Sequence, residues 1–452
     1  MTTQRVETSP GSPADGSAAA SSRSRWKRNE RRYRIAIAAL AALLIFALTS
    51  WQRERSRHEL ELELSASQQR DAAQREMAGL YARVMRAIVE DPNRPQSPEE
   101  AVQQFTDKAT EAISAGDPTP AEQAALAGGI GEILREMGFR SEATVFMDQA
   151  LRTALAHYGQ PHPEVAQRLD NVGAVLHERE EHAQAEVALT AAVSQRQDLG
   201  VADRGLLHSK RSLAATLRSQ NRHAEALELY LEVLAGWVRA KGSIGRAADS
   251  ELATSHWDLG STYYALGDFD SAEPHASQAL EMRRNESPRV DDHVYKAIFL
   301  MARVRAERGL RPESEALYRE ALRILNQGEI SRSGIKAARI KAELAGLLAP
   351  VNLETARRLV DESLKTLSPR APNHAATAEA MGVLGAILVE NYELEQAEPY
   401  LRESLRQIRI QRGDASWRTR RAIQRLIDLY EAWEKPEKQS RYVALLAELA
   451  PP

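Results

Sequence analysis

Two histidines come closest to a catalytic metal site. His177 and His182 flank the charged segment Glu-Arg-Glu-Glu. Zinc-dependent proteases use two histidines four residues apart on one helix face, with a glutamate between them as the general base. Here the spacing is five, so the two imidazoles project from different faces of a helix. The chain also has no cysteine to supply a thiolate ligand, and we expect no bound metal.

A glycine-rich stretch, Gly128-Gly129-Ile130-Gly131, has the composition of a phosphate-binding loop. A dinucleotide-binding loop must follow a strand and open a helix, whereas this stretch lies inside a segment with helical periodicity. The sequence contains neither a GxxxxGK[ST] loop nor a GxSxG nucleophile elbow. We therefore expect no cofactor, no small-molecule substrate and no enzymatic activity.

The composition favours an all-α protein. The chain has 452 residues, of which 43% are apolar, 27% charged and only 5% aromatic, and Ala, Leu, Glu and Arg are abundant helix formers. Its net charge of −3 does not have the basic excess of nucleic-acid-binding proteins, and we expect no nucleic-acid partner. The charge is uneven, because residues 1–34 carry eight Lys and Arg but three Asp and Glu.

An apolar segment near the N-terminus predicts a membrane span. Residues 1–32 form a polar, basic tail, which we expect to be disordered and cytoplasmic. Residues 33–51 include fourteen consecutive apolar residues, and a helix of that length is about 28 Å long, close to the ~30 Å hydrocarbon core. Seven basic residues precede the span and three follow it. This bias favours a single-pass protein of the inner (plasma) membrane that contacts the lipid bilayer through residues 33–51 and continues in the periplasm. The alternatives are a buried helix and a signal peptide.

Residues 52–118 are expected to form a helical neck and degenerate leading helices. An apolar stripe at three- and four-residue steps includes Met77, Leu80, Tyr81, Val84, Met85 and Ile88. The stripe either dimerises the chain as a coiled coil or packs on the structure that follows, and its length of under two heptads favours packing. Ser97-Pro98-Glu99-Glu100 and Thr119-Pro120-Ala121-Glu122 each predict the start of a helix.

Residues 119–452 contain a repeat of about 42 residues. The segments GEILREMGFRSEATVFMDQAL (131–151) and GAVLHEREEHAQAEVALTAAV (173–193) each have a small residue, a second one twelve positions on and a third seven beyond that. Two antiparallel helices can approach closely only where side chains are small, so the pattern predicts helix hairpins that stack. The second small position recurs at spacings of 42, 41, 46, 42, 42, 41 and 42, at Ala143, Ala185, Ala226, Ala272, Ser314, Ala356, Ala397 and Gln439. The longest step, through residues 238–250, predicts a loop.

The segment WDLGSTYYALGDFDSAEPHASQALEMRR (257–284) resembles the tetratricopeptide repeat. The period near 42 and the segment YGQPHPEV (158–165) are similar to the kinesin-light-chain type. The resemblance implies an α-solenoid, a right-handed superhelix of about eight repeats with the last as a cap, that binds proteins. The order of tail, span, helix and repeats also resembles the membrane half of bacterial membrane Ser/Thr kinases, although no kinase motif is present.

The resemblance further implies a concave surface formed by the first helix of each repeat. In the central repeats, positions that face away from the second helix carry cations and aromatics. We expect the cations to hold carboxylates of an extended, acidic or carboxylate-ended peptide and the aromatics to hold its apolar side chains. The alternative is a solvated charged face with aromatics that pack between repeats. The candidate residues are Asn171, His208, Arg211, Arg218, Trp257, Tyr264, Lys296, Phe299 and Arg303.

Peptide binding at this surface predicts that alanine at Arg211 and Arg303 together abolishes partner capture without lowering the melting temperature. The function expected is therefore that of a membrane-anchored scaffold for protein or peptide partners. Two alternatives are a kinase-less signalling relative of the membrane kinases and an accessory clamp for an envelope enzyme.

Overall fold

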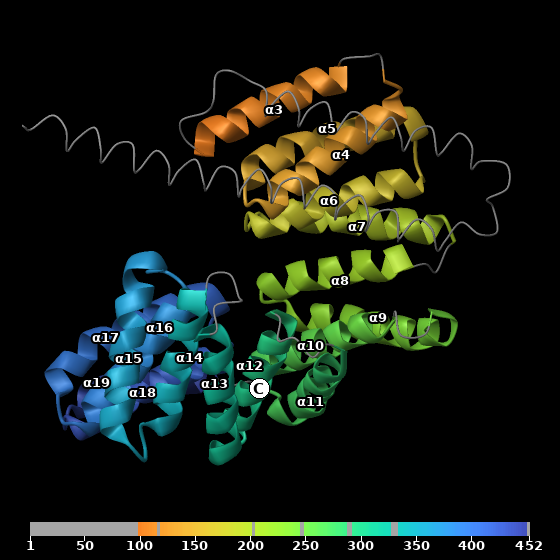
Figure 1. Ribbon diagram of the computed structural model, residues 1–452. Helices are drawn as coiled ribbons and strands as arrows, with labels where there is room; N and C mark the ends of the chain where they lie inside the picture. The colour runs from red at the N-terminus through yellow and green to blue at the C-terminus, as the bar shows by residue number, and fades with distance from the viewer. Residues whose placement is uncertain are drawn as a thin grey trace, which may run out of the picture. The chain divides into compact units, whose positions relative to one another are not determined.

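The computed structural model describes residues 98–114, 118–200, 204–244, 248–286, 292–326 and 333–449. Within these ranges the chain forms 17 α-helices and no strand (Figure 1), which confirms the predicted all-α solenoid. None of the described helices is both long enough and apolar enough to span a membrane. The predicted tail, membrane span and neck, residues 1–97, lie outside the described residues.

The chain divides into two compact units, residues 1–179 and 180–452, where the repeat pattern alone predicts one array. In the first unit, α3 contacts α4, α4 packs against α5, and α5 packs against α6. As predicted, α4 begins with a capping box, in which Thr119 and Glu122 bond each other's backbone amides. The described helices of this unit are α3 (Pro98–Ser114), α4 (Pro120–Glu136), α5 (Arg140–Tyr158) and α6 (Pro163–Glu178).

In the second unit each helix packs against the next, and α10, α12, α14, α16 and α18 also contact one another in turn. These five helices therefore form one continuous face of the solenoid, which we call the inner helices. The helices of this unit are α7 (His182–Asp198), α8 (Arg204–Ser219), α9 (His223–Ile244), α10 (Asp249–Leu266), α11 (Phe269–Glu286), α12 (Asp292–Glu307), α13 (Arg311–Asn326), α14 (Ser333–Leu348), α15 (Leu353–Arg370), α16 (Ala375–Glu390), α17 (Leu394–Arg412), α18 (Trp417–Ala432) and α19 (Pro436–Glu448).

Small residues lie where paired helices cross. A Cβ on Gly260 of α10 would come within 3.1 Å of the Ala276 backbone nitrogen of α11, so a larger residue there would push the two helices apart. Serine takes this role in three later helices without a cost in unpaired polar atoms. Each serine hydroxyl donates to a carbonyl of the facing helix: Ser314 to Ala302 (2.8 Å), Ser363 to Ala338 (2.7 Å) and Ser404 to Ala378 (2.7 Å).

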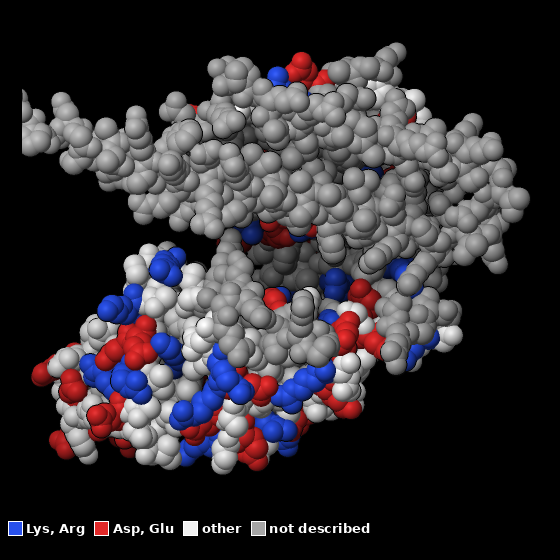
Figure 2. Space-filling model, in the orientation of Figure 1, with Lys and Arg blue, Asp and Glu red and all other residues white. Residues whose placement is uncertain are grey.

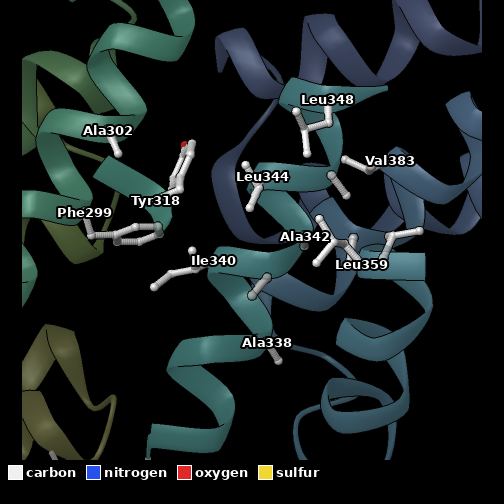
Figure 3. Packing of buried hydrophobic residues seen from close by; sticks show 14 of the residues in the cluster. Phe299, Ala302, Tyr318, Ala338, Ile340, Ala342, Leu344, Leu348, Leu359 and Val383 are labelled. Carbon is white, nitrogen blue, oxygen red and sulfur yellow. The ribbon is translucent and has the colours of Figure 1, made fainter. Parts of the chain in front are cut away.

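A continuous apolar core supports the inner helices. Figure 3 shows buried side chains of α14 between Phe299 and Tyr318 on one side and Leu359 and Val383 on the other. Ile340 at the centre of α14 is completely buried. Because each helix pair covers the apolar face left by its neighbour, the inner helices are held in a defined register.

The predicted loop at residues 238–250 is wrong for most of its length. Helix α9 continues to Ile244 and α10 begins at Asp249. Trp237, only 2% exposed, packs with Ala248 and Leu252, and Lys241 forms an ion pair with Asp249 at 2.8 Å. The extra residues therefore lengthen a helix whose apolar side anchors the following turn.

Candidate binding site

The structure places the two chemically suggestive sequence segments inside helices or at their ends. His177 lies in the last turn of α6 and His182 begins α7. Gly128 and Gly131 are buried within α4, where backbone amides bond within the helix. Among the described residues, no cluster of three or more His, Asp or Glu side chains could hold a metal ion.

Two of the predicted peptide-binding residues contact side chains of their own repeat. Asn171, in the first unit, accepts a hydrogen bond from Gln167 Nε2 on the same helix (2.9 Å). His208 of α8 packs edge-on against Trp237 of α9, with 5.4 Å between ring centroids. His208 therefore faces the second helix of its own pair and not away from it.

Three predicted residues form a bridge from α8 through α10 to α12. The Arg218 guanidinium lies 5.4 Å from the Trp257 ring centroid and its Nη1 is 3.5 Å from Asp258 Oδ1. The Trp257 indole nitrogen in turn donates to the Lys296 carbonyl oxygen (3.2 Å). The Lys296 ammonium points elsewhere, to Asp292 at 2.8 Å. This arrangement ties successive repeats together.

Arg211, two turns before Arg218 on α8, is half-buried, and its side chain forms no ion pair or hydrogen bond among the described residues. Its charge acts on Asp258, and burial raises the pKa of that carboxyl despite Arg218 and Arg211. Arg211 is therefore the predicted cation that is most available to a ligand.

Tyr264, Phe299 and Arg303 pack against one another. The Arg303 guanidinium lies 4.3 Å from the Tyr264 ring centroid and 5.4 Å from that of Phe299, and both rings are buried. Its Nε donates to Glu343 Oε2 at 2.9 Å, with both side chains less than 15% exposed. Removal of Arg303 would leave Glu343 buried without this partner, so we now expect the Arg211 and Arg303 double variant to melt at a lower temperature.

The inner helices enclose a cavity of about 250 Å³. Of the predicted residues, Tyr264 lines it. Its charged lining is five arginines and three glutamates, without lysine or aspartate: Arg311, Arg339, Arg418, Arg421, Arg425, Glu307, Glu343 and Glu379. On the visible face of the second unit, by contrast, basic and acidic side chains are interspersed (Figure 2).

Glu379 of α16 is the central carboxylate of the cavity. Its Oε1 forms an ion pair with Arg418 Nε at 2.7 Å, and the side chains of Glu379 and Arg418 are 21% and 9% exposed. Burial alone would raise the pKa of Glu379, but the charges of Arg418 and three further arginines, Arg303, Arg339 and Arg412, lower it to about 2. Glu379 therefore remains ionised and stabilises the charged arginines around it.

The cavity carries more positive charge than its glutamates neutralise. Burial and neighbouring arginines lower the pKa of both Arg412 and Arg425 to about 10, and Arg412 Nε is buried without a hydrogen-bond partner. His223 of α9 responds to the same charges: burial, Arg412, Arg218 and Arg418 lower its pKa to about 4. An anion would be stabilised in this region.

Helix α18 reaches the cavity through contacts between residues far apart in sequence. The Trp417 indole nitrogen donates to the Tyr264 carbonyl oxygen (2.9 Å), 153 residues away. Its ring packs edge-on against Tyr264 and Phe269, at 5.5 and 5.3 Å between centroids. Arg421 pairs with Glu307 of α12. These contacts connect α18 directly to α10 and α12 across the inner face.

Sequence reasoning missed the arginines of α18 because it treated this repeat as a cap. A signal was present, since Arg418, Arg421 and Arg425 are spaced by three and four residues and so share one helix face. What the spacing could not reveal is that this face meets α10 and α12.

Family comparisons identify the repeats. Two tetratricopeptide-repeat profiles match the chain, one over residues 207–285 and the other over residues 124–164 and 377–406. No curated protein is significantly similar in sequence to the chain.

Solved structures with similar folds share less than 20% sequence identity with the chain. The apo form of the quorum sensor NprR from B. thuringiensis superposes with a TM-score of 0.56 and 15% identity, over 82% of this chain and 98% of that one. The apo form of RapI gives a TM-score of 0.51 and 17% identity, over 64% and 98%. A kinesin light chain from Podosopora anserina gives 0.40 and 17%, over 47% and 99%. The chain therefore contains tetratricopeptide repeats in an α-helical solenoid fold.

Proposed function

We propose that this chain is a non-catalytic scaffold that binds peptide or protein partners along the inner helices of its second unit. The observation that carries the proposal is the arginine-lined cavity, to which all five inner helices contribute residues, together with α13 and α17. The fold supports it, since stacked helix pairs create extended binding surfaces, and NprR, which has a similar fold, is a quorum sensor.

The size of the cavity defines how a partner would bind. A volume of about 250 Å³ is smaller than the roughly 300–1,000 Å³ of pockets that enclose a whole small ligand. One or two side chains of a partner can enter, and the rest of an extended segment would lie across the neighbouring helices. Arg211 and Trp257, on α8 and α10, are placed to contact such a segment.

Peptide selection followed by photocrosslinking tests this function. Peptides are selected on the full-length chain in detergent, and a photoreactive benzoylphenylalanine replaces either Arg311, which lines the cavity, or Arg358, whose side chain on α15 is 67% exposed. We expect selected peptides to label position 311, to leave position 358 unlabelled, and to be recovered uncleaved. Equal labelling of both positions, or no selected peptide, would contradict the proposal.

We also propose that residues 33–51 anchor the protein in the inner membrane with the repeats in the periplasm. The support is the length of the apolar segment and the excess of basic residues before it. Fusions of alkaline phosphatase and of a cytoplasm-only fluorescent protein after Pro452 test this topology. We expect phosphatase activity without fluorescence, whereas fluorescence without phosphatase activity would reverse the orientation.

A further inference from the structure

We propose that the arginine-lined cavity binds a doubly charged oxyanion group of the partner, either a phosphorylated side chain or two adjacent carboxylates. This inference rests on the proposed function, because it names the chemistry of the group that enters the cavity. Glu379 is the positioning residue that holds the arginines in place for that group.

The charges around the cavity are only partly paired. All three glutamates are engaged: Glu379 with Arg418, Glu307 with Arg421, and Glu343 with Arg303 and, at 3.6 Å, Arg339. The side chains of Arg311, Arg412 and Arg425 form no ion pair or hydrogen bond among the described residues. Five arginines thus line the cavity together with three glutamates, an excess of two positive charges. A single carboxylate would neutralise half of this excess, whereas a phosphoryl group carries about −1.5 to −2.

The guanidinium of Arg425 lies against a glycine of the facing helix. A Cβ on Gly382 of α16 would lie 2.4 Å from Arg425 Nη1, so a larger residue there would displace the guanidinium from this position. Arg425 lies seven residues after Arg418 and four after Arg421, on the same face of α18. Three guanidinium groups from one helix therefore line one side of the cavity.

The donor chemistry favours an oxyanion over other anions. Guanidinium groups present planar pairs of N–H donors that match two oxygens of a carboxylate or phosphoryl group. The lining contains arginine and no lysine. The site therefore supplies planar guanidinium groups with fixed pairs of donors, and not the single ammonium charge of a flexible lysine side chain. The ion pair between Glu379 and Arg418 orients this cluster before a ligand arrives.

Anion binding to the full-length chain in detergent tests the proposal. The probes are inorganic phosphate, N-acetylphosphoserine amide, succinate and acetate at matched ionic strength, measured by calorimetry and by thermal shift, because a ligand that binds only the folded state raises its melting temperature. We expect the dianions to bind at least about tenfold more tightly than acetate. Whichever of phosphoserine amide and succinate binds more tightly identifies the source of the group.

Two substitutions assign the binding to the cavity. Arg425→Gln should weaken dianion binding at least about tenfold, whereas Arg358→Gln, on the exposed surface of α15, should leave it unchanged. If Arg425→Gln does not fold, Arg311→Gln provides the same test, because Arg311 is exposed and lines the cavity. Acetate binding as tight as that of the dianions, or dianion binding unaffected by the cavity substitutions, would overturn the inference.

The results separate this inference from the proposed function. Selected peptides that label position 311 but do not compete with any dianion would leave the proposed function standing and remove the oxyanion site. Dianion binding at Arg425 without any selected peptide would retain the oxyanion site and contradict peptide binding.

Discussion

Substitution of Glu379 by glutamine should destabilise the second unit by about 3 kcal/mol, because breaking a buried ion pair leaves its partner uncompensated. Glu379 is the carboxylate nearest to Arg418, and three further arginines depend on its charge. For a unit of this size the loss corresponds to a fall in melting temperature of about 6 to 12 °C. Thermal unfolding followed by circular dichroism at pH 7 measures it.

The pH dependence of this variant gives a second readout. The pKa of Glu379 is about 2 in the folded protein and about 4.3 in an unfolded chain. The contribution of Glu379 to the free energy of unfolding is therefore fully present at pH values above its pKa in the unfolded chain and is lost as the pH falls towards 2. The difference between wild type and Glu379→Gln should shrink over that interval, and a constant difference would contradict the assignment.

Glu403 provides a matched control for Glu379. Its pKa is also lowered to about 2, chiefly by a hydrogen bond from Arg406, but this pair lies on the surface of α17, with side chains 37% and 57% exposed. Glu403→Gln should leave the melting temperature nearly unchanged, because water screens the exposed pair. Equal losses in both variants would show that burial of Glu379 does not decide its effect.

Substitution of Trp417 by alanine should cost about 3 kcal/mol, the lower end of the range for removal of a large aromatic side chain. The variant loses the hydrogen bond to the Tyr264 carbonyl and the packing against Tyr264 and Phe269. Since these contacts join α18 to α10 and α11, their loss should also raise amide hydrogen exchange in the last turn of α10. Hydrogen exchange measured by mass spectrometry, on peptides that cover the last turn of α10, tests this local effect.

Trp433, at the other end of α18, is the control for Trp417. Its ring stacks on Tyr430 at 6.5 Å and lies against Lys435, both close to it in sequence. Trp433→Ala should destabilise its own surroundings and leave exchange in α10 unchanged. If Trp417→Ala also leaves hydrogen exchange in α10 unchanged, the contact between α18 and α10 does not stabilise the end of α10.

The helices and their pairing could be predicted closely from the sequence, because both depend on local patterns. The small residues at positions such as Gly260 and Ala272 mark helix crossings, and both are buried in the structure. Ser363, a serine at such a crossing, obeys the same rule, since its hydroxyl donates to the Ala338 carbonyl. The prediction of a loop at residues 238–250 was wrong because the length of an insertion cannot distinguish a loop from a longer helix. Burial of Trp237 stabilises the longer helix.

The predicted binding residues were only partly informative. Arg218, Trp257 and Arg303 do lie on α8, α10 and α12 and do contact neighbouring repeats. The packing of Arg218 and Arg303, however, depends on Asp258 and Glu343, each of which lies on a different helix from its arginine. A cation read along one helix gives no indication of the carboxylate that another helix brings to it.

By itself, the sequence determined the all-α class, the repeat period and the positions where helices must approach, since these follow from side-chain size and spacing of 3.6 residues per turn. Only the tertiary structure decided which cations remain unpaired and where they meet. Arg418, Arg421 and Arg425 lie more than 100 residues after Tyr264 and Glu307, yet they line the same cavity. That meeting depends on the small rotation between successive repeats, which accumulates over the array and is not encoded in any one of them.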